Sequence, residues 1–152
     1  RDTDRSRGLG DVYKRQECDV PVISNDFYYT LLDMASVDVP KEKVCEGESI
    51  VPLLEGGKIE KRALYWHFPH YSNHGMQSPG GAIRYGDYKL LEYFENGTVQ
   101  LFDLKTDLGE QHDLSAEKPG VVKKLRKMLH AWRESVGASM PEPNPNFTGD
   151  KR

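Results

Sequence analysis

Apolar residues near the C-terminal end of the chain recur every three or four positions, which is the spacing of one face of an α-helix. Lys and Arg residues lie on the opposite side of the same segment. The pattern therefore predicts an amphipathic helix over residues 119–136 that buries one apolar stripe. The stripe consists of Val121, Val122, Leu125, Met128, Leu129, Trp132 and Val136.

Before this helix the chain changes to short runs rich in aromatic and aliphatic residues, which are typical of strands. Gly86-Asp87 joins two of these runs, and Asn96-Gly97 predicts a hairpin because both turn residues tolerate positive φ. A small antiparallel sheet must have one face covered. We therefore predict an α+β fold of about four antiparallel strands covered by the C-terminal helix. The expected strands are residues 63–68, 82–85, 88–94 and 98–104, with Tyr88, Leu90 and Phe94 facing Val99, Leu101 and Leu104.

A second helical spacing lies nearer the N-terminus, where Phe27, Leu31, Leu32 and Ala35 come after an extended segment at residues 20–25. Ser24 or Asn25 can cap this helix, and Asp26 suits its positive N-terminal end. Residues 37–62 contain several glycines and prolines and form a loop-rich connector. Beyond residue 138 the chain is an extended, proline-rich tail.

The first sixteen residues are polar, have no hydrophobic period and do not continue into the pattern of the residues after them. They are either a disordered leader or a translated sequencing adapter. Residues 11–16 are what GAT GTG TAT AAG AGA CAG encodes, the transposon end used in library preparation, and residues 6–10 continue that adapter. We therefore expect residues 1–16 to be an artefact of a metagenome assembly, with the genuine chain starting near Glu17. Without the five basic and three acidic residues of this leader, the formal charge changes from −3 to −5.

Composition limits the classes of function. The 152 residues suffice for one small domain with a core of its own. The charges are mixed along the sequence, so we expect no nucleic-acid partner. No apolar run reaches the roughly 20 residues that span a bilayer. Cys18 and Cys45 either pair or are ordinary thiols, and neither has metal-ligand spacing.

Several phrases of the chain carry a resemblance to one enzyme family. Residues 80–114, GGAIRYGDYKLLEYFENGTVQLFDLKTDLGEQHDL, are similar to the C-terminal subdomain of the formylglycine-dependent, arylsulfatase-like sulfatases of the alkaline-phosphatase superfamily. Residues 46–56 resemble the family's D-G-x-S-x-x-P-L-L-x-G, with Glu46 replacing Asp. Residues 107–114 resemble its D-P-x-E-x-x-N-L, with Leu108 replacing Pro and Asp113 replacing Asn. Tyr29 stands where the family's helix phrase commonly has Pro.

The resemblance implies the domain organisation. Residues 17–62 are expected to be the end of a large α/β sulfatase domain and a connector, with the apolar residues of 46–56 sealing the seam between subdomains. Residues 63–137 are expected to form the C-terminal subdomain, and residues 138–152 the tail. The N-terminal sulfatase domain is then a missing partner of this chain.

The resemblance also implies that the parent protein hydrolyses sulfate esters, with sulfated carbohydrates or other sulfated small molecules as substrates. A parent of this family uses Ca²⁺ and a formylglycine residue and is periplasmic or secreted. Formylglycine arises from Cys or Ser in a C-x-P-x-R or S-x-P-x-R phrase, which neither Cys18 nor Cys45 begins. We therefore predict that the catalytic centre and the calcium ligands lie outside this chain, and that the chain alone is inactive.

Substrate contact is the role that remains for this chain. The candidate residues at the rim of the substrate pocket are His67, His70, Tyr71, His74 and Arg84. Imidazole, phenol and guanidinium groups suit hydroxyl and sulfate oxygens. The alternative is that His67 points into the sheet, that the other two histidines are solvated, and that Arg84 and Lys89 form structural salt bridges. No zinc site is expected, because zinc needs three or four converging ligands. His70 is the leading candidate.

Two other functions remain open. A phosphodiesterase or phosphonate hydrolase of the same superfamily would be distinguished by comparing activity on sulfate and phosphate esters. A stand-alone binding or structural module without catalysis would be distinguished by the reading frame upstream of Glu17. Asp107 and Glu110 are expected to cap turns, and His112 and His130 to be surface or core-edge residues.

Overall fold

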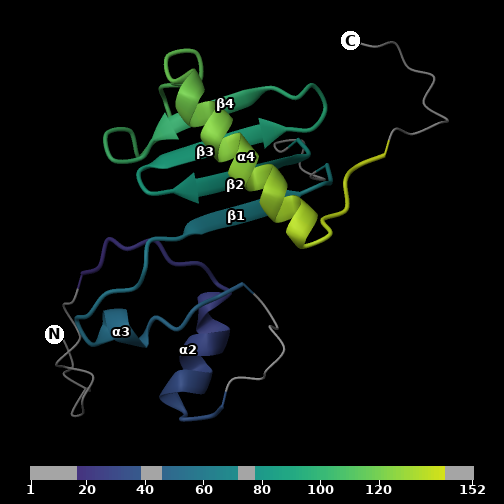
Figure 1. Cartoon of the computed structure of the whole chain (residues 1–152). Coiled ribbons are helices and arrows are strands. Elements are labelled where there is room, and N and C mark those ends of the chain that lie inside the picture. Colours follow the sequence, from purple (N-terminus) through teal and green to yellow (C-terminus); the bar gives the residue numbers. More distant parts are fainter. Residues whose placement is uncertain (1–16, 39–45, 72–77, 143–152) are drawn as a thin grey trace, which may run out of the picture. The chain divides into compact units, whose positions relative to one another are not determined.

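The computed structural model describes residues 17–38, 46–71 and 78–142. The chain forms two compact units, Arg1–Glu60 and Lys61–Arg152, which we call the N-terminal unit and the C-terminal unit. Figure 1 shows the described helices and strands of both units.

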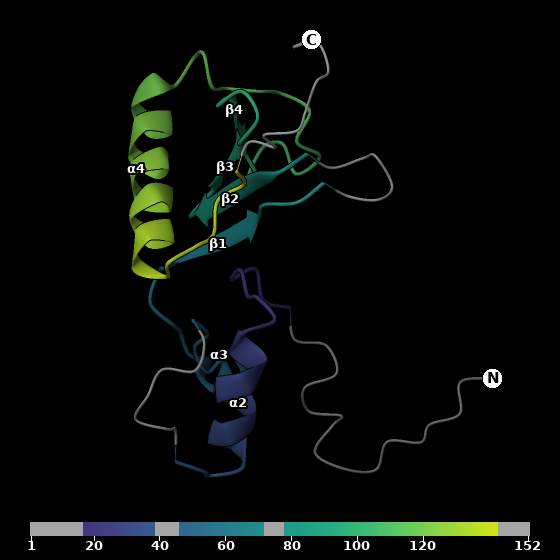
Figure 2. The ribbon, with the colours of Figure 1, turned by 90° about the vertical axis from the view of Figure 1, so that its right-hand side faces the viewer.

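The C-terminal unit is one antiparallel sheet with a long helix across one of its faces (Figures 1 and 2). The strands lie in the sheet in the order in which they occur in the sequence, so strands that are neighbours in the sheet are also consecutive along the chain. The predicted α+β fold is therefore confirmed. The strands are β1 (Ala63–Phe68), β2 (Gly80–Tyr85), β3 (Tyr88–Tyr93) and β4 (Val99–Asp103), and the helix is α4 (Pro119–Ser135).

The two hairpin turns differ from each other. Between β2 and β3, Gly86 adopts a φ of 64°, which only glycine reaches without strain. The hairpin predicted at Asn96-Gly97 is confirmed between β3 and β4, and its loop has four residues, because Tyr93 donates its N–H to the carbonyl of Thr98. Only Gly97 in that loop has positive φ. Asn96 instead accepts hydrogen bonds from the Thr98 N–H and hydroxyl, which is the local bonding that makes Asn a turn residue.

The core lies between the sheet and α4. Ile83, Leu90 and Leu101 occupy one face of the sheet and meet the fully buried Leu125 and Leu129 of the helix. Leu90 lies directly opposite both Ile83 and Leu101, so the predicted pairing of Leu90 with Leu101 is confirmed. Burial of each such side chain stabilises the fold by about 1.5–3 kcal/mol. At the edge of this core, Tyr65 and Trp132 stack with ring centroids 4.8 Å apart.

The end of α4 is set by a glycine. Gly137 adopts a φ of 60° and donates to the carbonyl of Glu134, while Ala138 donates to the carbonyl of Arg133. These two bonds form a Schellman motif, which satisfies carbonyls that the helix leaves unpaired. The motif turns the chain back toward β1, where the carbonyl of Ser139 lies 2.7 Å from Nε2 of His67.

The loop between β4 and α4 is held by carboxylates that accept backbone N–H groups. Asp107 accepts from Gln111 and His112, and these two bonds lower the pKa of its carboxyl group. Asp113 accepts from Leu101 of β4 and from Ser115. The expected turn-capping role of Asp107 is confirmed, whereas Glu110 bonds Lys89 across 2.6 Å.

In the N-terminal unit, helix α2 (Asp26–Met34) packs against a segment that includes the short helix α3 (Val51–Leu54). Asn25 is the first flanking residue of α2, but its side chain makes no capping hydrogen bond, so the cap predicted at Asn25 is wrong. The buried Asp26 instead accepts the N–H groups of Ile23 and Glu48.

A polar stripe on α2 holds this second segment. Asp26, Thr30 and Asp33 are spaced by four and three positions and lie on one face of the helix. Thr30 accepts the N–H of Ile50 across 3.0 Å, and Asp33 accepts the hydroxyl of Ser49 across 2.5 Å. The apolar side chains of Phe27, Leu31 and Met34 are all more than half exposed.

Candidate functional site

His67 lies on the face of the sheet that α4 covers. Its neighbour across the ladder is Gly81, and its ring lies 5.3 Å from that of Phe94. Because Nε2 contacts the Ser139 carbonyl, this nitrogen carries the proton, and the contact ties β1 to the chain that comes after α4. The geometry gives His67 a structural contact, as the alternative interpretation expects.

His70 and Tyr71 lie beyond the end of β1 and are exposed. The imidazole of His70 meets the ring of Phe68 edge-on, with centroids 5.8 Å apart. The Tyr71 hydroxyl donates to Oε1 of Glu95, in the loop between β3 and β4, across 2.6 Å. This bond to a carboxylate, together with burial and the negative charge, raises the pKa of Tyr71. The two side chains therefore extend from the same end of the sheet as the β3–β4 loop.

Arg84 is separated from these residues. Arg84 lies opposite Leu64, whereas Phe68, at the end of β1, lies opposite Gly80. Positions 84 and 80 are therefore about 13 Å apart along β2. The half-buried side chain of Arg84 has a buried Nε without a hydrogen-bond partner in the described part of the chain. Lys89, directly opposite Arg84, is paired with Glu110, so the structural salt bridge expected for Lys89 is present. His74 lies outside the described residues.

The most strongly charged cluster was not predicted. Glu92 of β3 is buried beneath α4 and is contacted by Arg126 Nε at 2.6 Å, by His130 Nε2 at 3.0 Å and by Arg133 Nη2 at 2.6 Å. The angle at Arg133 makes that contact an ion pair rather than an aligned hydrogen bond. The available signal was the spacing of the three basic side chains by four and three positions, which places them on one helix face.

The environment of Glu92 shifts its ionisation. Burial acts to raise the pKa of its carboxyl group, but the contacts with Arg126, His130 and Arg133 and the charge of Arg133 outweigh burial and lower it. Arg133 also lies over the ring of Phe94, 4.8 Å from the centroid. A Cβ at Gly81 would lie 2.7 Å from Arg133 Nη2, so the glycine makes room for the guanidinium.

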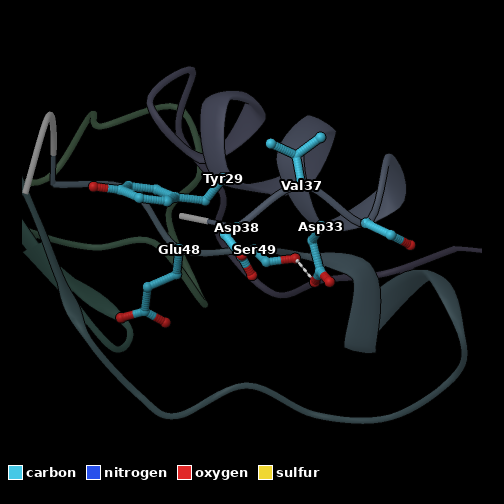
Figure 3. A pocket seen from close by; sticks show the side chains of 8 residues that line it. Tyr29, Asp33, Val37, Asp38, Glu48 and Ser49 are labelled. Carbon is cyan, nitrogen blue, oxygen red and sulfur yellow. Dashed lines mark hydrogen bonds between the residues drawn. The ribbon is translucent and has the colours of Figure 1, made fainter. Parts of the chain in front are cut away.

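A pocket in the N-terminal unit has the wrong charge for a sulfate ester. Figure 3 shows its lining, where the Ser49 hydroxyl points at Asp33 along the hydrogen bond. Asp33, Asp38 and Glu48 contribute three carboxyl groups, and no basic side chain is among the described lining residues. Like charges repel a bound sulfate, so this part of the lining disfavours one. The described lining residues are Tyr29, Asp33, Ser36, Val37, Asp38, Gly47, Glu48 and Ser49.

Within residues 17–38, 46–71 and 78–142, no three His, Cys, Asp or Glu side chains are grouped so that they could hold a metal ion. Cys18 is exposed and is followed by Asp19, Val20 and Pro21, so the phrase that yields formylglycine is not formed there. Among the described helices, none is long and apolar enough to cross a membrane.

Known proteins that resemble this chain are sulfatases. A sulfatase of Formosa agariphila is 36% identical over an alignment of 122 positions, and the match covers 70% of this chain and 22% of that protein. The N-acetylglucosamine-6-O-sulfatase of Bacteroides thetaiotaomicron is 30% identical, and the match covers 84% of this chain and 24% of that protein. The solved structure of BT4656 in complex with its substrate D-glucosamine-2-N,6-O-disulfate superimposes with a TM-score of 0.63 at 28% identity, over 76% of this chain and 24% of that one.

The chain thus spans about a quarter of the length of the curated relatives it matches. Residues 9–135 match the family described as N-sulphoglucosamine sulphohydrolase, C-terminal. This match covers the sheet and α4 completely and extends through the N-terminal unit. The chain therefore belongs to this family of sulfatase C-terminal regions.

Proposed function

We propose that this chain is the C-terminal part of an enzyme that hydrolyses sulfate esters of carbohydrates. The observation that carries the proposal is the family match over residues 9–135. The substrate class is supported by two relatives from Bacteroides thetaiotaomicron that act on sugars, one an N-acetylglucosamine-6-O-sulfatase and the other a Δ4,5-hexuronate-2-O-sulfatase.

In this proposal the reaction takes place outside the chain. The nucleophile, a formylglycine, and the calcium ligands belong to a preceding N-terminal domain that completes the protein. The short coverage of the relatives supports this division of the parent enzyme. The exposed apolar side chains of α2, Phe27, Leu31 and Met34, are the surface that such a domain would cover.

The contribution of this chain to the reaction is contact with the sugar at the end of β1. His70 is exposed, and no described side chain hydrogen-bonds its imidazole. Tyr71 is fixed by Glu95, whose carboxylate accepts its hydroxyl and raises its pKa. An imidazole held against Phe68 can donate to a sulfate oxygen or accept from a sugar hydroxyl. His70 is therefore the proposed substrate-contacting residue, and Tyr71 is its neighbour on the same segment.

The experiment is to recover the reading frame upstream of Glu17, express the whole protein, and measure release of sulfate and of phosphate from matched sugar esters. We expect sulfate release, with N-acetylglucosamine 6-sulfate among the first substrates to test. Release of phosphate alone would favour the phosphodiesterase alternative. An upstream frame with a start codon and no large domain would refute the proposal.

His70→Ala in that protein tests the contact residue. We expect a loss of about 10-fold in kcat/KM, carried mainly by KM, because a binding contact of about 1.4 kcal/mol disappears. His112→Ala is the matched control, since His112 is exposed in the loop before α4. Equal effects of the two substitutions would exclude a specific role for His70.

A further inference from the structure

The positive charge of the described chain is concentrated on α4. Its 17 residues contain five Lys or Arg side chains and one Glu, a formal charge of +4, whereas the whole chain carries −3. The rest of the chain therefore sums to −7. Figure 2 shows that one side of α4 lies against the sheet. Arg126 and Arg133 contact Glu92 of the sheet, and Lys124 lies over the ring of Tyr85, whereas Lys123 and Lys127 are exposed.

Part of this charge borders a shallow groove along the helix. Its described lining combines the apolar residues Val122 and Ala131 with basic or imidazole groups. Positions 123, 126, 127 and 130 span about 10 Å of helix at 1.5 Å per residue. The described lining residues are Ser115, Pro119, Val122, Lys123, Arg126, Lys127, His130, Ala131 and Glu134.

Two of the groove's side chains are held in position by the buried Glu92. Arg126 contacts Glu92 through Nε, so its two terminal nitrogens point away from that bond and have no acceptor in the described part of the chain. His130 is fixed by both carboxylate oxygens of Glu92. Side chains that are already ordered lose less entropy when a ligand binds.

The two lysines of the groove have no neighbouring carboxylate that neutralises their charge in the described part of the chain. Lys123 and Lys127 are exposed and have no ion-pair partner in the ranges that the structure describes. They are four positions apart on one helix face, and like charges at this spacing destabilise a helix by about 0.2–0.5 kcal/mol. An anion bound between these side chains would relieve this repulsion.

We propose that the groove formed by Lys123, Arg126, Lys127 and His130 binds a stretch of sulfated polysaccharide. The ligand class rests on the proposed sulfatase function, but the site itself rests on the charge and geometry of α4. A sulfate ester offers several oxygen acceptors and a permanent charge, which a guanidinium recognises in a planar fork. Single-stranded nucleic acid fits less well, because the described lining residues of the groove include no aromatic side chain to stack on bases.

The test measures binding by the full chain to size-fractionated dextran sulfate, by calorimetry, at several salt concentrations. Unsulfated dextran, polyglutamate and single-stranded DNA serve as comparison ligands. We expect Lys123→Gln with Lys127→Gln to weaken dextran sulfate binding about 5- to 10-fold and to flatten the salt dependence. These lysines are exposed, so the double variant should keep its fold, and circular dichroism checks this.

The matched control is Lys58→Gln with Lys105→Gln, which removes the same charge from exposed positions outside the groove. We expect it to change affinity less than about twofold. Absence of dextran sulfate binding, or an equal loss in the control, would overturn the site. Equally tight binding of polyglutamate or DNA would overturn the assignment to sulfated glycans. Because binding is measured without turnover, a parent that releases no sulfate would refute the proposed function and leave this result standing.

Discussion

Helices α2 and α4 bury opposite kinds of side chain. Helix α4 buries apolar side chains, Leu125 and Leu129, and turns its lysines to solvent. Helix α2 buries polar side chains, Asp26 and Thr30, and leaves Leu31 and other apolar residues exposed. Helix α4 has the arrangement expected of a surface helix in a globular protein, with apolar side chains inside and charged ones outside, whereas α2 has the reverse arrangement.

The difference follows from the contacts that each helix makes within its own unit. Because the sheet supplies an apolar face to α4, burial of the stripe drives their association. Residues 48–50 supply mainly backbone N–H groups and a hydroxyl to α2, so Asp26 and Thr30 are buried as acceptors. The apolar side of α2 has no comparable neighbour among the described residues of its unit, which is why it fits the proposed contact with a preceding domain.

The largest effect is expected at the buried charge beneath α4. Glu92→Ala leaves Arg133 buried without its counter-charge, and removing one member of a buried pair typically destabilises by about 3–5 kcal/mol. Denaturant unfolding followed by tryptophan fluorescence measures this, because Trp66 and Trp132 both lie in the C-terminal unit. A loss below about 1 kcal/mol would show that the cluster is solvated.

The pH dependence of the same site has a defined sign. The pKa of Glu92 is lowered in the folded state, so its stabilising contribution is fully present above the unfolded value of about 4.3. That contribution is lost as the pH falls through the lowered folded value. The Glu92→Gln variant should therefore have a lower free energy of unfolding than the unmodified chain at pH 7, and this difference should shrink as the pH falls into the acid range. A constant difference across this range would contradict the assigned ion pairs.

The apolar contact between α4 and the sheet comes next. Leu129→Ala removes a fully buried side chain and should destabilise the C-terminal unit by about 2–5 kcal/mol. The matched change on α2 is Leu31→Ala, at a side chain that is 64% exposed, which should stay within about 0.5 kcal/mol in this chain. Similar effects of the two leucine substitutions would break the comparison between the helices.

A smaller effect is expected at the polar stripe of α2. Thr30→Val keeps the shape of the side chain but removes the acceptor of the Ile50 N–H, which should destabilise the N-terminal unit by about 1–3 kcal/mol. Hydrogen exchange at Ile50 should speed up, while exchange in β3 stays unchanged. Unaltered protection of Ile50 would show that this bond does not hold the segment.

The smallest free-energy change should have a visible effect on association. Replacing Phe27 and Leu31 by Ser removes two exposed apolar groups, with little change in unfolding free energy. We expect the unmodified chain to self-associate in size-exclusion chromatography and the double variant to do so less. A monomeric unmodified chain would argue against a covering domain on α2.

The sequence was sufficient for the C-terminal unit. Periodicity is reliable where one face is buried, and the predicted stripe of Leu125 and Leu129 meets the predicted Leu90 and Leu101. The start of β2 was missed by two residues, because Gly80 and Gly81 indicated a loop. In the folded chain these glycines are needed for close approach, since a Cβ at Gly80 would lie 2.8 Å from the carbonyl oxygen of Glu92.

The charged and polar sites were less predictable. The mixed charge along the sequence concealed the cationic groove, because the acidic residues that balance it lie on other elements. The buried acceptors of α2 were missed for a related reason: their partners, Glu48 and Ile50, are about 20 positions away. Of the proposed substrate contacts, the structure separates Arg84 from His70 and Tyr71, and their roles remain predictions.

The space that Gly81 leaves for Arg133 makes the two positions dependent on each other. Any side chain at position 81 displaces the guanidinium from Glu92, and a shorter residue at position 133 removes this clash and leaves the Trp66 carbonyl oxygen, 3.2 Å from a Cβ at position 81, as the remaining restriction. Substitutions at the two sites should therefore be non-additive, and a change at one becomes tolerable after a change at the other. In a diverging lineage the order of mutations would matter at this pair, so that the first step, rather than the final combination, limits which sequences are reached.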